Sequence, residues 1–178
     1  MSEKKNVYEK AKGQMRLSER IVAALPGFRG YKEKELRRES DKLIRDHIYE
    51  KLSKARSDLK AVFQKLSDRR SFDVLNDMDR LVARFDRVTE KVNHASYGYS
   101  GFFDAAKIEE AALDRMIDFD NQLADDADKI VNEVSVFKAE VVKQKFDKAK
   151  ERVQSLSETL TAFEDAFDKR HEVILGAV

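Results

Sequence analysis

The sequence has no cysteine and no tryptophan, and only one proline and six glycines among its 178 residues. Without cysteine there is no disulfide, thiolate nucleophile or zinc–thiolate site. So few prolines and glycines argue against a sandwich or barrel, which needs a turn about every ten residues. The longest apolar runs, 21–25 and 173–175, are much shorter than the roughly 20 residues of a membrane-spanning helix. We therefore expect a helical, soluble, cytoplasmic protein with no signal peptide and no transmembrane segment.

Charged residues make up 39% of the chain, well above the usual quarter, and they are unevenly distributed. Residues 1–103 carry 24 Lys/Arg against 16 Asp/Glu, whereas residues 104–178 carry 11 against 18. One interpretation is that the two halves pack together and neutralise each other. The other is a basic face on the N-terminal helices. We favour the first, because mixed charges on helices usually line solvated faces.

Apolar residues recur at steps of three and four through most of the chain, which is typical of amphipathic helices. The pattern predicts an all-α fold, an elongated antiparallel bundle of four or five helices in a single domain, 1–178. The expected helices are approximately 4–25, 31–66, 72–93, 104–132 and 135–171. Between Asp104 and Leu175 there is no glycine or proline, yet the apolar stripe slips, so we place a turn near 132–135. The alternative is one very long helix that absorbs the slip. The residue identities reveal no internal repeat.

The only proline interrupts the first two helices within residues 25–31. Pro26 ends the first helix, because it lacks an amide donor and biases Leu25 away from helical angles. The segment that follows, PGFRGYKEKELRRE from Pro26 to Glu39, resembles a segment of a family of uncharacterised prokaryotic all-helical proteins. The resemblance covers about the first third of the chain. It implies a helical fold and a prokaryotic cytoplasmic origin, and it carries no known activity.

Motifs for catalysis and metal binding are largely missing from the sequence. The glycines do not have the spacing of a phosphate-binding or dinucleotide-binding loop, and no Glu-x-x-His pair of a di-iron bundle occurs. Residues 118–121 begin like a calcium loop, but Leu123 stands where the loop needs glycine and Lys129 where it needs glutamate. We interpret the acidic cluster at 125–128 as a solvated helix end. The sequence therefore predicts no catalytic residue, no metal site and no cofactor.

A second break, residues 97–103, combines two glycines with four aromatic rings. Exposed aromatic side chains on such a loop could anchor a partner or stack on bases, or they could cap the end of the bundle. We expect this loop to lie at the same end as the 25–31 connection, forming one aromatic end. The candidate partner-binding residues are Phe28, Arg29, Tyr31, Arg37, Arg38, Tyr97, Tyr99 and Phe102.

The leading functional hypothesis is a non-enzymatic helical scaffold or protein–protein interaction module. Its partner would be another protein or a second copy of the chain. One alternative is binding of nucleic acid, another anionic polymer or a membrane surface through the basic N-terminal helices. A further alternative is an enzyme or ligand-binding bundle with the 97–103 loop at its site.

Overall fold

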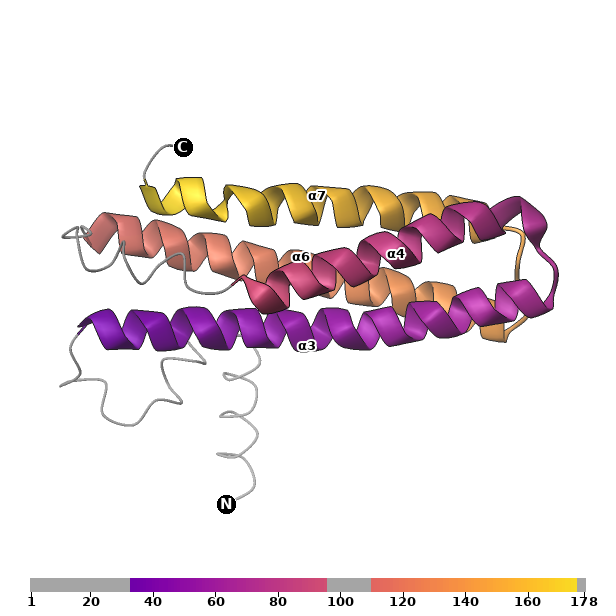
Figure 1. Cartoon of the computed structure of the whole chain (residues 1–178), viewed down its shortest axis with the longest axis horizontal. Helices are drawn as coiled ribbons and strands as arrows, with labels where there is room; N and C mark the ends of the chain where they lie inside the picture. Colours follow the sequence, from indigo (N-terminus) through magenta and orange to yellow (C-terminus); the bar gives the residue numbers. More distant parts are fainter. Residues whose placement is uncertain (1–32, 96–109, 176–178) are drawn as a thin grey trace, which may run out of the picture.

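The computed structural model describes residues 33–95 and 110–175, and all regular structure within these ranges is helical. The four helices are α3 (Glu33–Asp68), α4 (Phe72–His94), α6 (Glu110–Val142) and α7 (Ala149–Leu175). They pack lengthwise into an elongated bundle (Figure 1). The predicted all-α bundle is thus confirmed. The predicted helix at 4–25 lies outside the described residues.

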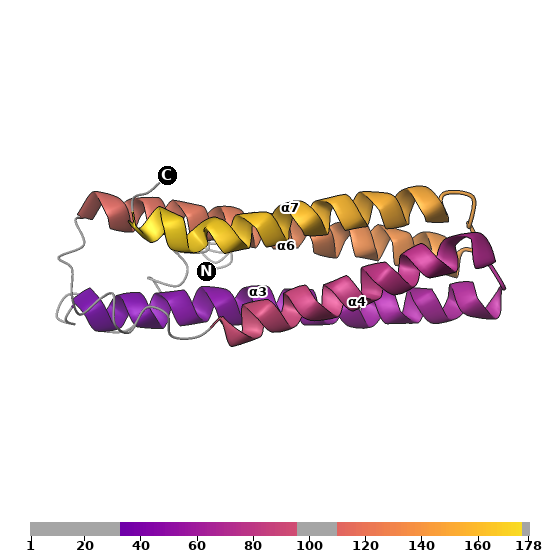
Figure 2. The same cartoon turned by 45° about the horizontal axis from the view of Figure 1, so that its top comes forward.

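The bundle consists of two helical hairpins placed side by side. α3 packs on α4 and α6, and α7 packs on α4 and α6. Within each hairpin the helices are antiparallel, as predicted, whereas α3 runs parallel to α6 and α4 runs parallel to α7 (Figures 1 and 2). Ion pairs agree with this direction, because Lys51 pairs with Asp128 and Asp58, further along α3, pairs with Lys138, further along α6. The turns 69–71 and 143–148 therefore meet at one end of the bundle, which we call the turn end.

The two hairpins bury hydrophobic residues at the same spacing along the sequence. Every buried hydrophobic residue from Ile48 to Val92 has a buried counterpart 75 positions later, as Val74 has Ala149 and Phe85 has Leu160. The residue types rarely match, which is why the repeat is invisible in the residue identities. The ion pairs between α3 and α6 join residues 77 and 80 positions apart, so counterparts 75 positions apart lie near one another in height but are not level. The buried counterparts in the second hairpin are Leu123, Ala127, Ile130, Val134, Phe137, Val141, Ala149, Val153, Leu156, Leu160, Phe163 and Phe167.

The predicted turn at 132–135 is wrong, and so is the alternative of one uninterrupted helix. α6 continues to Val142 because Val134, Phe137 and Val141 extend its buried stripe without a break. The chain turns only at 143–148, where the apolar pattern slips. Val142, the last residue of α6, is 54% exposed, and Phe146 is half-buried within the turn. The last helix, α7, therefore begins after both of them, at Ala149.

Both turns end their first helix in the same way. Arg70 and Gln144 have positive φ angles of 57° and 58°. The next amide reaches back five residues in each case: Ser71 N–H donates to the Leu66 carbonyl at 3.2 Å, and Lys145 N–H donates to that of Glu140 at 2.9 Å. This is the Schellman arrangement, in which glycine usually occupies the left-handed position. With arginine and glutamine there instead, the sequence gives no glycine signal for either turn.

One smaller expectation also needs correction. The cluster at 125–128 lies in the middle of α6 and not at a helix end. It is nevertheless largely accessible to solvent. Asp128 pairs with Lys51 across the α3–α6 contact, and Asp126 accepts a hydrogen bond from Lys129 at 2.7 Å.

Candidate functional site

The structure describes the backbone of only two of the predicted partner-binding residues, Arg37 and Arg38, in the first turns of α3. Phe28, Arg29, Tyr31, Tyr97, Tyr99 and Phe102 lie outside the described residues. The aromatic end therefore stays a prediction. The described part offers three other features: the α4–α7 contact with its groove, a buried ion pair, and the turn end.

Opposite charges of the two halves meet between α4 and α7. The Glu164 carboxylate of α7 lies among three cations of α4, with Arg84 at 3.0 Å, Arg87 at 3.1 Å and Lys91 at 3.6 Å. Lys91 also lies 2.6 Å from Asp168. Along this contact the basic first half and the acidic second half neutralise each other, as the first interpretation of the charge distribution expects.

The surroundings of Glu164 alter its acidity. Burial acts to raise the pKa of this carboxyl, since only 12% of the side chain is exposed. Hydrogen bonds from Arg84 and Arg87, with the charges of Arg87 and Lys91, outweigh burial and hold the pKa below its ordinary value. Glu164 is therefore ionised at neutral pH, and its charge contributes to the docking of α7 on α4.

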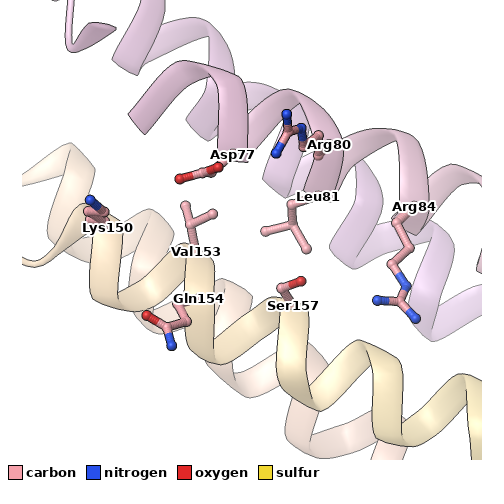
Figure 3. Close-up of a pocket in the computed structure, with 8 residues that line it drawn as sticks. All are labelled: Asp77, Arg80, Leu81, Arg84, Lys150, Val153, Gln154 and Ser157. Atoms are coloured by element: carbon pink, nitrogen blue, oxygen red, sulfur yellow. The ribbon is translucent and has the colours of Figure 1, made fainter. Parts of the chain in front are cut away.

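A groove of about 410 Å³ opens between the first turns of α4 and α7 (Figure 3). Leu81 of α4 and Val153 and Ser157 of α7 face one another across it, with Lys150 and Arg84 at opposite ends. Arg84 is engaged, because it donates to Thr161 and Glu164. The complete lining is Asp77, Arg80, Leu81, Arg84, Lys150, Val153, Gln154 and Ser157.

The groove has an apolar floor and a polar rim, on which the cations Arg80 and Lys150 are accompanied by the carboxylate of Asp77. Arg80 and Lys150 form no ion pair within the described part of the chain. Leu81 and Val153 form the floor but are only 2% and 3% exposed, so a segment entering the groove would meet mainly the polar side chains of its rim.

At the end of the bundle away from the turn end, the core includes an ion pair. Asp120 of α6 and Arg170 of α7 form a bidentate contact, Nε to Oδ1 at 2.6 Å and Nη2 to Oδ2 at 2.7 Å. Their side chains are 2% and 5% exposed. The pair lies beyond Leu123 and Phe167. Because its geometry is demanding, it fixes the register of α6 against α7.

His94, in the last turn of α4, occupies an open surface. His94 Nε2 lies 3.4 Å from Glu90, and its side chain is 77% exposed. Glu90 is also bound by Arg56 at 2.8 Å. Within residues 33–95 and 110–175 no group of three or more potential metal ligands comes together, and no helix is both long and apolar enough to cross a bilayer.

Comparisons with protein-family models, curated proteins and solved structures gave no match to this chain. The resemblance of residues 26–39 therefore stays a prediction, and the functional argument rests on the chain's own geometry.

Sequence reasoning missed both the buried pair and the groove. A signal existed for the pair, because Asp120 lies three residues before buried Leu123 and Arg170 three residues after buried Phe167, both at inward positions of the stripe. No comparable signal exists for the groove. It depends on which positions of α4 and α7 face each other, and only the docking of the two hairpins decides that.

Proposed function

We propose that this protein is a non-enzymatic helical scaffold that binds another protein, or a second copy of itself, through its surface. The observation that carries the proposal is the fixed register of the bundle. Cross-helix ion pairs connect α3 to α4, α3 to α6, α4 to α7 and α6 to α7 around a filled hydrophobic core. These ion pairs and the core hold the helices in a rigid rod. A partner that binds the outer faces of the rod therefore causes little loss of the protein's conformational entropy.

The α4–α7 groove is the docking position that we assign to the partner. Arg80 and Lys150 stand against one carboxylate, Asp77, on the rim, and this excess of positive charge favours acidic side chains. The expected occupant is a protein segment that carries Asp or Glu. Charge complementarity at the rim would select the segment.

Photo-crosslinking in native cells tests the proposal. A photoreactive amino acid at Gln154, on the rim of the groove, should give a discrete adduct with one protein. The same amino acid at Ala162, exposed on α7 outside the groove lining, is the matched control and should give none. Adding Ser157→Trp should fill the groove and abolish the Gln154 adduct. Equal adducts at both positions, or no adduct at Gln154, would contradict the proposal.

A further inference from the structure

The two turns bring together basic residues that lie far apart in the sequence. Residues 68–73 and 143–150 hold six cations against three carboxylates, Asp68, Asp73 and Asp147. All six cationic side chains are exposed. None of the six forms an ion pair in the described part of the chain. Arg69 donates a hydrogen bond to Gln144 at 2.5 Å, and its guanidinium carbon lies 4.9 Å from the Phe146 ring centre. The cations are Arg69, Arg70, Lys143, Lys145, Lys148 and Lys150.

The position of these cations contrasts with that of the cations on the sides of the bundle. Lys51, Arg84, Arg87, Lys91 and Lys138 are all paired with carboxylates of a neighbouring helix. Some cations on the sides, such as Lys54, Arg80 and Lys169, also form no ion pair in the described part of the chain, but they are scattered, whereas six are gathered on the two turns. Two of these six, Lys145 and Lys148, lie near the carboxylate of Glu140, whose pKa their charges help to lower.

The two turns lie at one end of the bundle, where the α3–α4 turn reaches further out than the α6–α7 turn (Figures 1 and 2). The cations of both turns are therefore gathered at this end, across a bundle of four helices roughly 20 Å wide. The exposed apolar side chain of Val142 lies at the same end.

We infer that the turn end is a docking surface for an anionic lipid bilayer. Cations gathered on the end of a rod can together meet a plane of phosphate and carboxylate headgroups. The exposed apolar side chain of Val142 at the same end suits a bilayer better than the phosphate backbone of a nucleic acid. Val142 can enter the headgroup layer between the cations. The scaffold would then stand upright on a membrane, leaving the groove and its sides accessible to a partner.

Vesicle co-sedimentation with the full chain tests this inference. Vesicles of 30% phosphatidylserine in phosphatidylcholine should bind the protein at low salt, whereas pure phosphatidylcholine should not, and high salt should release it. Each cation near such a surface contributes roughly a fivefold gain in affinity, and each reversal to glutamate changes two charges. Lys145→Glu with Lys148→Glu should therefore weaken binding by two orders of magnitude or more.

The matched control is Lys54→Glu with Lys169→Glu. It makes the same change in net charge at two exposed lysines that form no ion pair in the described part and lie away from the turn end. The control should lower affinity only slightly. Failure to bind anionic vesicles at low salt would overturn the inference, as would equal losses in the two variants. Full binding by the Lys145→Glu/Lys148→Glu variant would also overturn it, by placing the contact elsewhere in the chain.

A parallel titration with a 30-base-pair duplex distinguishes the other polyanion. If the duplex binds more tightly than the vesicles at equal salt, and the turn-end variant loses that binding, the surface recognises nucleic acid and the lipid assignment is wrong. The groove variant Ser157→Trp should leave vesicle binding unchanged. Failure of the partner proposal and failure of the membrane proposal are therefore separate outcomes.

Discussion

The buried Asp120–Arg170 pair provides the sharpest test of the packing. Asp120→Ala would leave the guanidinium of Arg170 buried, at 5% exposure, without the carboxylate that receives two of its hydrogen bonds. Removing one partner of a buried pair typically costs about 3–5 kcal/mol, because the desolvated charge that remains loses its bidentate counter-ion. Since a domain of this size is stable by about 5–15 kcal/mol, the variant should lose a large share of its stability.

Urea unfolding followed by far-ultraviolet circular dichroism measures this loss. With a slope of about 2 kcal/mol per molar urea, the midpoint should fall by roughly 1.5–2.5 M. The double variant Asp120→Leu/Arg170→Met is the informative control. It removes both charges, and it should recover most of the stability because apolar replacement of a buried pair is often neutral or better. A loss below about 1 kcal/mol in Asp120→Ala would show that the pair is accessible to water and refute the reasoning.

Three further predictions follow from the described contacts. The surroundings of Glu164 lower its pKa from 4.5, so the stability that its charge contributes is complete above that pH and is lost as the pH falls through the folded-state pKa. Glu164→Gln lacks this charge at every pH. Its urea midpoint should therefore fall less between pH 7 and pH 3 than that of the parent chain. Phe137→Ala, at a side chain 1% exposed, should cost about 3–5 kcal/mol in urea unfolding, and a cost below about 1 kcal/mol would mean that its layer is not packed as described. Gln144→Gly should raise the melting temperature, because glycine adopts the left-handed conformation without the cost of about 1 kcal/mol that glutamine has there. The control Ala139→Gly, within α6, should lower the melting temperature. A fall in both variants would contradict the turn geometry.

The sequence predicted the fold class and most of the first hairpin. The apolar spacing placed helices at 31–66 and 72–93, and the structure has α3 at Glu33–Asp68 and α4 at Phe72–His94. The spacing was sufficient there because the polar residues 67–71 interrupt the apolar stripe and separate the two helices. In the second hairpin the turn has no glycine or proline, and Gln144 adopts a positive φ that its residue type does not suggest. The slip in the apolar stripe was visible, but it was assigned about ten residues too early.

The candidate sites could not be predicted in the same way, because each depends on long-range docking. Arg69 and Gln144 come together only because the two hairpins pack in parallel, and composition alone directed attention to the N-terminal basic helices. The ring of cations around Glu164 likewise joins residues about 80 positions apart. Amphipathic spacing specifies that a helix packs, but it does not specify which neighbour it packs against or in which direction.

The parallel docking of the hairpins is the central claim, because the groove and the charged turn end both depend on it. The chain has no cysteine, so engineered pairs report on contacts without interference. Lys91→Cys with Asp168→Cys, at positions whose side chains are in contact, should form an intramolecular disulfide rapidly under mild oxidation. Lys91→Cys with Gln154→Cys should not, because parallel docking places these positions near opposite ends of α4 and α7. A disulfide in the second pair and none in the first would show that the hairpins dock antiparallel and would contradict both proposals.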